Sequence, residues 1–395
     1  MSDILNRRDA IAFGGAAFVA WVGGKLCSAD ASGRPLPEGD AYAPWRLWND
    51  PSVRGTPLAL VAAAVLAANP HDTQPWLFAV EADAIEIYAD LSRNLGAMDP
   101  YVREMHLGLG CAIENMVLAA ASNGFDAEVE ATAGSLTVDD RQSHTRAATV
   151  HLAKRAPVAP DALCIAIPDR HTNRYAYDRG KAPASEWRRF ASDPDIGDGV
   201  RVILVEDGEQ RRLFDAAIIE ATEAIIADAA MIADSDRWFR DSSQAIEAHR
   251  DGPTLDAAGL PFFTLMFARA FSVSPETSHR GWLKQTREVQ VPTAPLVGLI
   301  AVRDRYDRGD AIAAGRAWQR LHLNATAHGM AMQPLNQPIE MIDRERQLGR
   351  APAWAGRIAR LTGDDWQATF SFRAGFATQS APASPRRRLK DVLMG

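Results

Sequence analysis

Ala68-Asn69-Pro70-His71-Asp72-Thr73-Gln74-Pro75-Trp76 decides the fold, because this stretch gathers short polar side chains between two prolines. An apolar segment precedes it and a partly alternating segment follows it, so it connects a predicted helix to a predicted strand. The prolines restrict the residues before them and stiffen the turn, which aims the amides, hydroxyl and imidazole in fixed directions. Such a loop suits the polar edge of a flat ring. The alternative interpretation is an ordinary helix-to-strand turn over a buried tryptophan.

Composition places the chain among globular proteins. Its 395 residues, 47% hydrophobic and 24% charged, can bury a large core in two domains or in one intertwined double unit. A net charge of −7, with no basic tract longer than Arg386-Arg387-Arg388, argues against a nucleic-acid partner. Three cysteines are too few for a disulfide framework. His322 and His328 are six residues apart and diverge on a helix, so we predict no metal site.

The N-terminal region is typical of a twin-arginine export signal. Asn6-Arg7-Arg8-Asp9 precedes a mildly apolar run that ends near Gly24, and small residues follow at Ala29-Asp30-Ala31. We therefore predict a signal peptide over residues 1–31 and a linker or surface strap over 32–56. A fixed anchor is the alternative, although the run is shorter than the roughly 20 apolar residues that a membrane span needs. The expected partner is the twin-arginine translocase, the expected location is periplasmic or otherwise extracytoplasmic, and no stable span is expected after processing.

A repeat at a spacing of 205 residues indicates a tandem duplication. Two predicted helices share small and apolar positions, and prolines near each helix also have near-matching partners. We predict one half over residues 57–205 and a second over 206–395, with possible lid helices around 206–233. Coincidence between two core helices is the alternative. The matched positions are Gly110, Ala112, Leu118, Ala120 and Gly124 with Gly315, Ala317, Leu323, Ala325 and Gly329, and Pro57 and Pro70 with Pro261 and Pro275.

The loop at 68–76 resembles the flavin-ring loop of the nitroreductase family, in its Acg-like branch, where the wording is roughly Pro-His-Asn-Thr-Gln-Pro-Trp. Asp72 stands where that branch usually has Asn. The stretch from Gly315 to Glu340 is also similar to the branch, and the resemblance covers roughly residues 57–393. It implies an α+β sandwich of two fused pseudo-repeat halves, an internal version of the usual homodimer, with FMN at the interface. The segment Ser274–His279, interpreted as the second copy of the loop, lacks the Gln-Pro-Trp set, so one FMN per chain and a monomer are expected.

The resemblance also assigns residues to the cofactor. Two guanidinium groups and a hydroxyl within residues 170–174 can bind phosphate oxygens in a fork, although a solvated turn is the alternative for so short a run. The C-terminal arginine pair could equally be a solubilising tail. The implied contacts are His71, Asp72, Thr73 and Gln74 at the polar ring edge; Gln333, Pro334, Leu335 and Asn336 in the loop facing N5; and Arg170, Thr172, Asn173, Arg174 and Arg373 at the phosphate, with Arg386 and Arg387 ranked below them.

The function that the resemblance implies is an exported FMN-binding oxidoreductase. Hydride would pass through flavin N5 to a small-molecule acceptor with a nitro, quinone or activated alkene group, and no side chain would act as nucleophile or base. A catalytically silent protein that stores or sequesters FMN is the alternative. A binding protein for something other than flavin is the third possibility.

Overall fold

Two four-stranded antiparallel sheets form the framework of the computed structural model, which describes residues 19–22, 25–28, 39–137, 142–181, 184–261, 264–265 and 274–394. The first sheet has the order β3-β4-β6-β5, with β3 at Trp76–Val80, β4 at Ala84–Asp90, β5 at Phe125–Ala131 and β6 at His144–Lys154. The second has the order β7-β8-β10-β9, with β7 at Arg201–Val205, β8 at Leu296–Val302, β9 at Ala331–Pro334 and β10 at Gln367–Gly375.

Both sheets have the same topology. In each, the strands that come first, second, fourth and third along the chain lie side by side in that order. One long helix connects the second strand to the third: α3, Arg103–Ala120, in the first half and α12, Arg308–Ala327, in the second. The two helices begin 205 residues apart, which is the spacing of the sequence repeat. The predicted α+β fold of two pseudo-repeat halves is therefore confirmed.

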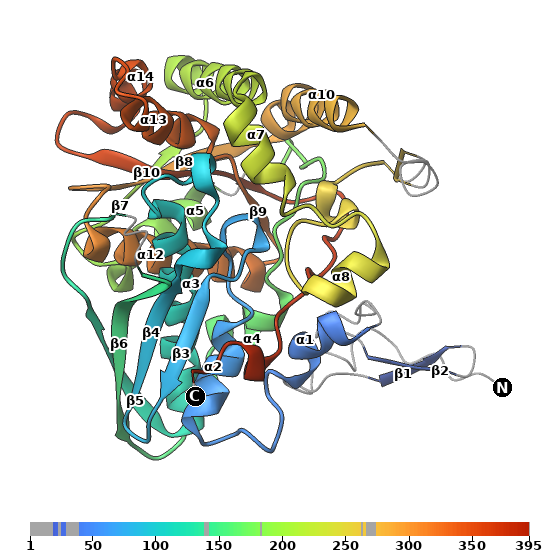
Figure 1. The fold of residues 1–395 in the computed structure, drawn as a ribbon, viewed down its shortest axis with the longest axis vertical. Helices are drawn as coiled ribbons and strands as arrows, with labels where there is room; N and C mark the ends of the chain where they lie inside the picture. The colour runs from blue at the N-terminus through green and yellow to red at the C-terminus, as the bar shows by residue number, and fades with distance from the viewer. Residues whose placement is uncertain are drawn as a thin grey trace.

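Helices α3 and α12 cross at a pair of glycines. A Cβ atom on Gly110 would lie 2.2 Å from the carbonyl oxygen of Ile312, and one on Gly315 would lie 2.1 Å from that of Leu107. Gly110 and Gly315 are 205 residues apart, and so are Leu107 and Ile312, so the two contacts are copies of each other. A pseudo-twofold axis passes through the crossing, as in a self-complementary homodimer interface. Figure 1 shows the two helices between the sheets.

The layers explain the burial patterns of the strands. Every residue of β8 is buried, whereas β4 alternates between buried and half-buried residues. Sheet 2 is covered on one face by α12 and on the other by α6, α13 and α14, while one face of sheet 1 remains in solvent (Figure 1). The bounds of the outer helices are Gly208–Ala227 for α6, Gln337–Gln347 for α13 and Ala353–Thr362 for α14.

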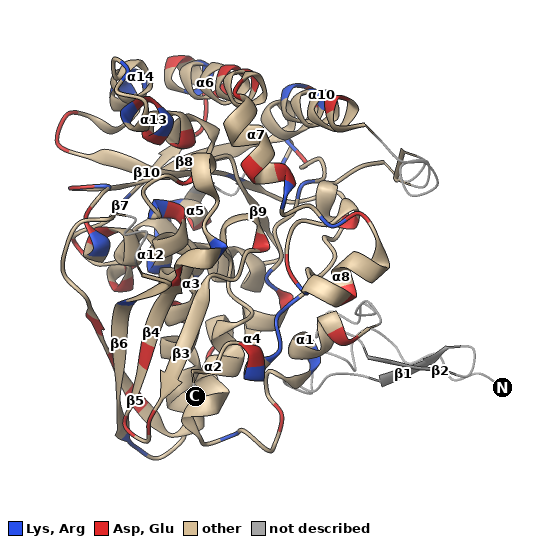
Figure 2. Ribbon diagram, viewed as in Figure 1, with Lys and Arg blue, Asp and Glu red and all other residues tan. Residues whose placement is uncertain are grey.

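Ion pairs connect the helices of the outer layer. Figure 2 shows acidic and basic residues interspersed on α6, α13 and α14. Arg357 of α14 pairs with Glu220 of α6, and Arg344 of α13 pairs with Asp228 at the end of α6. Side chains of both signs therefore meet across this layer instead of forming a face of one sign.

The two halves differ most in one connection. Residues 81–83 join β3 to β4, whereas residues 206–295 join β7 to β8 and carry α6, α7, α8, α10 and α11. We call residues 206–295 the insertion. The second sheet starts at Arg201, five residues before the expected boundary of the halves. The remaining bounds in the insertion are Ala229–Asp236 for α7, Ser243–His249 for α8, Pro275–Gln285 for α10 and Val291–Thr293 for α11.

The proline correspondence and the second loop copy were predicted wrongly. Pro275 is the first residue of α10, where Ser274 caps the helix by accepting a hydrogen bond from the Thr277 amide. Pro261 also lies in the insertion, which the first half lacks. By topology, the counterpart of the 68–75 loop is the segment before β7, where Pro194–Ile196 forms a 3₁₀ turn. Proline occupies the first turn of many helices, so its recurrence did not require duplication.

The structure describes only part of the N-terminal region. Val19–Val22 and Lys25–Ser28 form a small hairpin, β1 and β2, and the rest of the predicted signal peptide lies outside the described residues. Part of the predicted linker packs as a strap, because Tyr42 and Trp45 are buried around α1, Ala43–Leu47. The other helices of the first half are α2 at Pro57–Ala64, α4 at Ala162–Ala166 and α5 at Ala184–Ala191.

One helix of the described residues is long and apolar enough to cross a membrane. It is α3 continued to Asn123, and 78% of its apolar window is buried inside the protein. Its hydrophobicity is accounted for by the crossing with α12 and by the first sheet.

Candidate functional site

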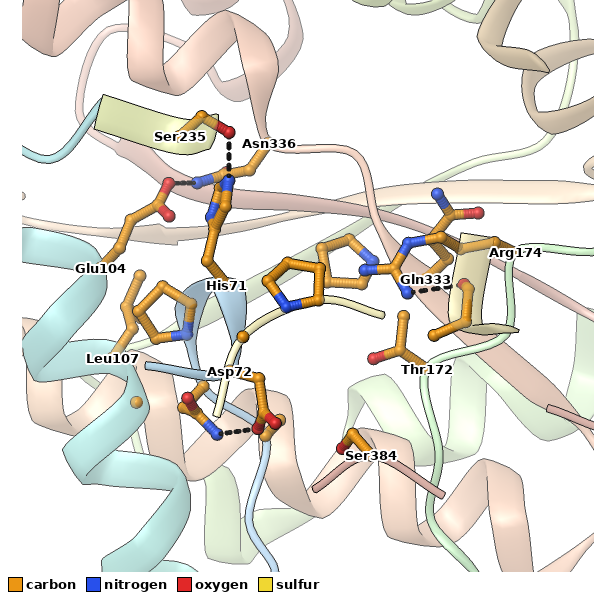
Figure 3. A pocket seen from close by; sticks show the side chains of 18 of the residues that line it. His71, Asp72, Glu104, Leu107, Thr172, Arg174, Ser235, Gln333, Asn336 and Ser384 are labelled. Atoms are coloured by element: carbon orange, nitrogen blue, oxygen red, sulfur yellow. Dashed lines mark hydrogen bonds between the residues drawn. The ribbon is translucent and has the colours of Figure 1, made fainter. Parts of the chain in front are cut away.

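A cavity of about 340 Å³ lies where the two halves meet. Its walls come from the loop at 68–72, helix α3, the run at 170–174, the end of β9, the C-terminal segment at 382–386 and the insertion. Figure 3 shows side chains from these segments pointing toward one space. The volume falls in the range of small-molecule sites.

The loop at 68–76 has an unusual backbone. His71, Asp72 and Gln74 have φ angles of 45°, 48° and 49°. Residues other than glycine seldom adopt this region of the backbone map. The Asn69 side chain holds the turn by accepting a hydrogen bond from the Gln74 amide at 2.8 Å. Gly108 of α3 lets the loop approach, since a Cβ atom there would lie 2.9 Å from the Pro70 ring. Strain of this kind commonly accompanies a functional site.

The loop also contacts the insertion. His71 Nε2 lies 3.0 Å from the hydroxyl of Ser235, which belongs to α7 (Figure 3). Burial, and then the nearby Arg174, lower the pKa of His71 to about 4. The imidazole is therefore neutral at pH 7.

Asp72 forms an ion pair with Arg386 of the C-terminal segment. The same carboxylate oxygen accepts a hydrogen bond from Asn69 at 3.3 Å, while the other oxygen is buried without a partner among the described residues. Burial raises the pKa of Asp72 to about 7, although Arg386 acts in the opposite direction.

Three guanidinium groups line the cavity close to this carboxylate: those of the buried Arg170 and Arg386 and of the half-buried Arg174. Arg170 donates to the carbonyl of Leu66 at 3.2 Å and Arg174 to that of Ala257 at 3.1 Å. Within the described residues, neither of these two forms an ion pair. Burial, and then the neighbouring Arg386, lower the pKa of Arg170 to about 10, so it remains charged at pH 7. This end of the cavity therefore carries excess positive charge.

The opposite wall is acidic and apolar. Asn336 donates a hydrogen bond to the carboxylate of Glu104 and accepts one from the Ser371 amide at 3.1 Å (Figure 3). Glu340, from the first turn of α13, lines the same wall. Apolar side chains complete this part of the cavity: Met98, Leu107, Phe239, Trp282, Trp318 and Phe370.

The structure brings most of the predicted residues together. Nine line the cavity: His71, Asp72, Arg170, Thr172, Arg174, Gln333, Pro334, Asn336 and Arg386. Six do not line it: Thr73, Gln74, Asn173, Leu335, Arg373 and Arg387.

Gln74 and Arg373 hold neighbouring segments in place next to the cavity. The Gln74 amide group donates to the Arg250 carbonyl at 2.8 Å and accepts from the Arg387 backbone at 2.7 Å, which ties the loop to the C-terminal segment. Arg373 is fully buried and donates to Gln333 Oε1 at 2.7 Å. Its guanidinium therefore orients Gln333 rather than reaching the cavity.

Sequence reasoning missed Glu104, Glu340 and the walls contributed by the insertion. Glu104, Gly108 and Cys111 share one face of α3 at helical spacing, and this face lines the cavity. That spacing, next to the repeated Gly110, was the available signal. Ser235, Phe239 and Trp282 come from the insertion, where no local pattern marks them.

Comparisons with known proteins agree with the motifs. A Mycobacterium tuberculosis H37Rv protein named "Putative NAD(P)H nitroreductase" is 27% identical over 342 residues, which are 85% of this chain and 90% of that protein. The "Putative NAD(P)H nitroreductase acg" of the same strain is 25% identical over 357 residues, 84% of this chain and 93% of that protein. The resemblance to Acg-like nitroreductases is thereby confirmed.

Solved structures and family models were also compared. The FMN-dependent nitroreductase NfnB from Mycobacterium smegmatis in complex with NADPH has a TM-score of 0.36 and 17% identity, covering 59% of this chain and 97% of that one. A nitroreductase with bound FMN from Desulfitobacterium hafniense has a TM-score of 0.35 and 16% identity, covering 60% of this chain and 98% of that one. No protein-family model matches the chain.

Proposed function

We propose that this relative of the nitroreductases is an FMN-dependent oxidoreductase with one cofactor site per chain. The observation that carries the proposal is the cavity between the halves, with Arg170, Arg174 and Arg386 at one end. A dianionic phosphate would neutralise this buried positive charge and accept charge-assisted hydrogen bonds. Unpartnered Nε atoms of Arg170 and Arg386, within the described residues, are consistent with a ligand there.

The other lining residues fit the remaining parts of FMN. Thr172 and Ser384 line the cavity with hydroxyl groups, and Asp72 and His71 supply polar atoms for a ring edge. Trp318 and Phe370, with ring centroids 4.6 Å apart, contribute aromatic surface. When bound, FMN supplies two-electron hydride chemistry at N5, while the protein provides orientation and electrostatics.

The finer parts of the proposal concern location and substrates. The Arg7-Arg8 pair and the apolar run after it support export of the folded protein through the twin-arginine translocase. The names of the relatives support a nicotinamide donor and a nitro group as the acceptor. A quinone or an activated alkene is an acceptor that hydride transfer from flavin N5 would also allow.

A protein that holds FMN without turnover is the second candidate, and one observation favours it. The insertion contributes Ser235, Phe239, Gly252 and Trp282 to the cavity wall, and Ser235 contacts His71 directly. A site covered in this way restricts the approach of a large donor or acceptor.

Purified protein distinguishes the candidates. We expect visible flavin absorbance and, after heat release, FMN close to one equivalent per chain. Oxidation of NADPH, or of dithionite-reduced protein, by a quinone or nitroaromatic supports the oxidoreductase. Stoichiometric flavin that neither donor nor acceptor can reach supports the holding protein, and absence of flavin, together with no binding of added FMN, contradicts both.

A further inference from the structure

The carboxyl groups of Glu104 and Glu340 form a pair in the cavity wall. Glu104 comes from α3 in the first half, and Glu340 comes from α13 in the second. Each residue is only 7% exposed, and the two carboxyl groups are close enough for that of Glu104 to raise the pKa of Glu340. Two ionised carboxylates at this separation repel each other, so the pair favours the state in which one of the groups is protonated.

The surroundings favour a single shared proton. Burial and the neighbouring Glu104 raise the pKa of Glu340 well above its ordinary value, and burial raises the pKa of Glu104 to about 7. Arg103 contacts Glu104 at 3.4 Å and favours its ionised form, but the guanidinium is mainly bound to Asp343 at 2.7 Å. Asp99, which accepts hydrogen bonds from the start of α3, adds negative charge nearby and acts in the same direction as Asp343. Glu340 therefore holds the proton of the pair at pH 7.

The pair also borders the cavity. Both residues line it, and Glu340 Oε2 has no hydrogen-bond partner among the described residues. Asn336, in the segment that the resemblance assigns to flavin N5, donates to Glu104, and the Glu340 amide donates to the Asn336 carbonyl at 3.1 Å. The carboxyl pair thus lies beside the segment expected at the reactive edge of the cofactor.

We propose that Glu340, paired with Glu104, is the general acid that protonates the acceptor during reduction. This inference rests on the proposed function and goes beyond it, since the resemblance assigns no acid. Reduction of a quinone to a hydroquinone takes a hydride, supplied by the reduced flavin, and one proton. The O–H bond of Glu340 breaks, an O–H bond forms on the quinone oxygen, and the remaining carboxylate recovers a proton from solvent. General acid catalysis typically contributes on the order of 10² to 10⁴ in rate.

The kinetic test uses two acceptors with flavin reduced beforehand by dithionite. A quinone needs a proton as it is reduced, whereas ferricyanide takes electrons alone. We expect Glu340→Gln to slow flavin reoxidation by the quinone on the order of 10²-fold and to leave reoxidation by ferricyanide unchanged. Glu104→Gln should slow the quinone reaction as well. Glu114→Gln is the matched control, because Glu114 is a buried glutamate of the same helix that faces Arg316 and Arg320 instead of the cavity.

Infrared spectroscopy tests the shared proton without turnover. At pH 7 the wild-type protein should show a protonated carboxyl band that is lost in Glu340→Gln and kept in Glu114→Gln; the difference between wild type and variant separates it from bands of Asp72 and Asp99. A wild-type spectrum that matches that of Glu340→Gln would overturn the proposal even if the variant were poorly folded. Equal slowing with both acceptors, or no slowing, would also overturn it. Wild-type protein whose reduced flavin reacts with neither acceptor would overturn the proposed function and this inference with it.

Discussion

Arg170 and Arg174 are the residues on which the proposed recognition of the FMN phosphate depends most directly. Each donates to one backbone carbonyl and has no ion-pair partner within the described residues. We expect Arg170→Ala and Arg174→Ala to weaken FMN binding by about 1.5 to 3 kcal/mol each, through the loss of a charge-assisted phosphate contact. Calorimetric titration of the flavin-free protein with FMN and riboflavin measures this. Riboflavin lacks the phosphate, so equal losses for both ligands would show that the arginines are structural.

Asp72 gives the stability of the protein a pH dependence. Its pKa is raised from 3.8 to about 7 in the folded state, mainly by burial, so between these values the folded protein binds a proton that the unfolded chain has lost. The stabilisation that comes from this proton is complete below about pH 4 and is lost as the pH rises toward 7. The free energy of unfolding then falls by up to about 1.4 kcal/mol per pH unit. Asp72→Asn should make the unfolding free energy less dependent on pH over this range.

Urea denaturation between pH 4.5 and 7.5 measures that slope. Asp50→Asn serves as the control, because Asp50 is exposed and hydrogen bonds from Ser52 lower its pKa. If the slope of Asp72→Asn equals that of the wild type, Asp72 is ionised throughout, and its pairing with Arg386 outweighs the cost of burial.

At the level of elements, the crossing of α3 and α12 depends on the absence of two side chains. Alanine at Gly110 would place its Cβ 2.2 Å from a backbone carbonyl oxygen, which can move only if the helices separate. We expect Gly110→Ala and Gly315→Ala each to lower the unfolding free energy by about 1 to 3 kcal/mol. Gly356→Ala, in α14, is the matched control because nothing lies within 4 Å of its Cβ position, and it should raise stability by up to about 1 kcal/mol. Thermal melts of the three variants would contradict this explanation if all shifted in the same direction.

Some elements could be predicted from sequence because a local rule specifies them. The strand that partial alternation predicts after the 68–76 loop is present, in the hairpin of β3, Trp76–Val80, and β4, Ala84–Asp90. The repeat identified α3 and α12 because close helix crossing demands small residues at fixed spacing. The insertion gave no such signal, since its prolines and caps mark helix starts without saying which strands they separate.

The candidate site, too, could be predicted only where a local motif marks it. The segments around the cavity were found from their motifs, but which side chains face it was predicted only in part. In a loop with positive φ angles, backbone conformation rather than spacing sets the direction of each side chain, and Thr73 and Gln74 do not line the cavity. Arg373 and Arg387 donate hydrogen bonds to backbone carbonyls that only the folded chain brings close to them.

At the scale of the whole molecule, both halves of the expected interface lie within one chain. We therefore predict a monomer that carries one FMN. Analytical ultracentrifugation should give the mass of a single chain, and flavin released by heat should approach one equivalent. A stable homodimer that shares flavin across chains, or two equivalents of FMN per chain, would contradict the internal-dimer explanation.

The reciprocal contact of Gly110 and Gly315 has a consequence for how such a protein can evolve. In a symmetric pair of identical subunits, every substitution appears on both sides of the axis, so a residue that improves one pocket must be tolerated in the other. Fusion removes that constraint, because each position is inherited separately. Glu104 and its counterpart 205 residues later, Gly309, already differ in this way: an acidic group lines one pocket and is missing from the equivalent helix position. One half of the chain is thus free to lose its site while the other specialises.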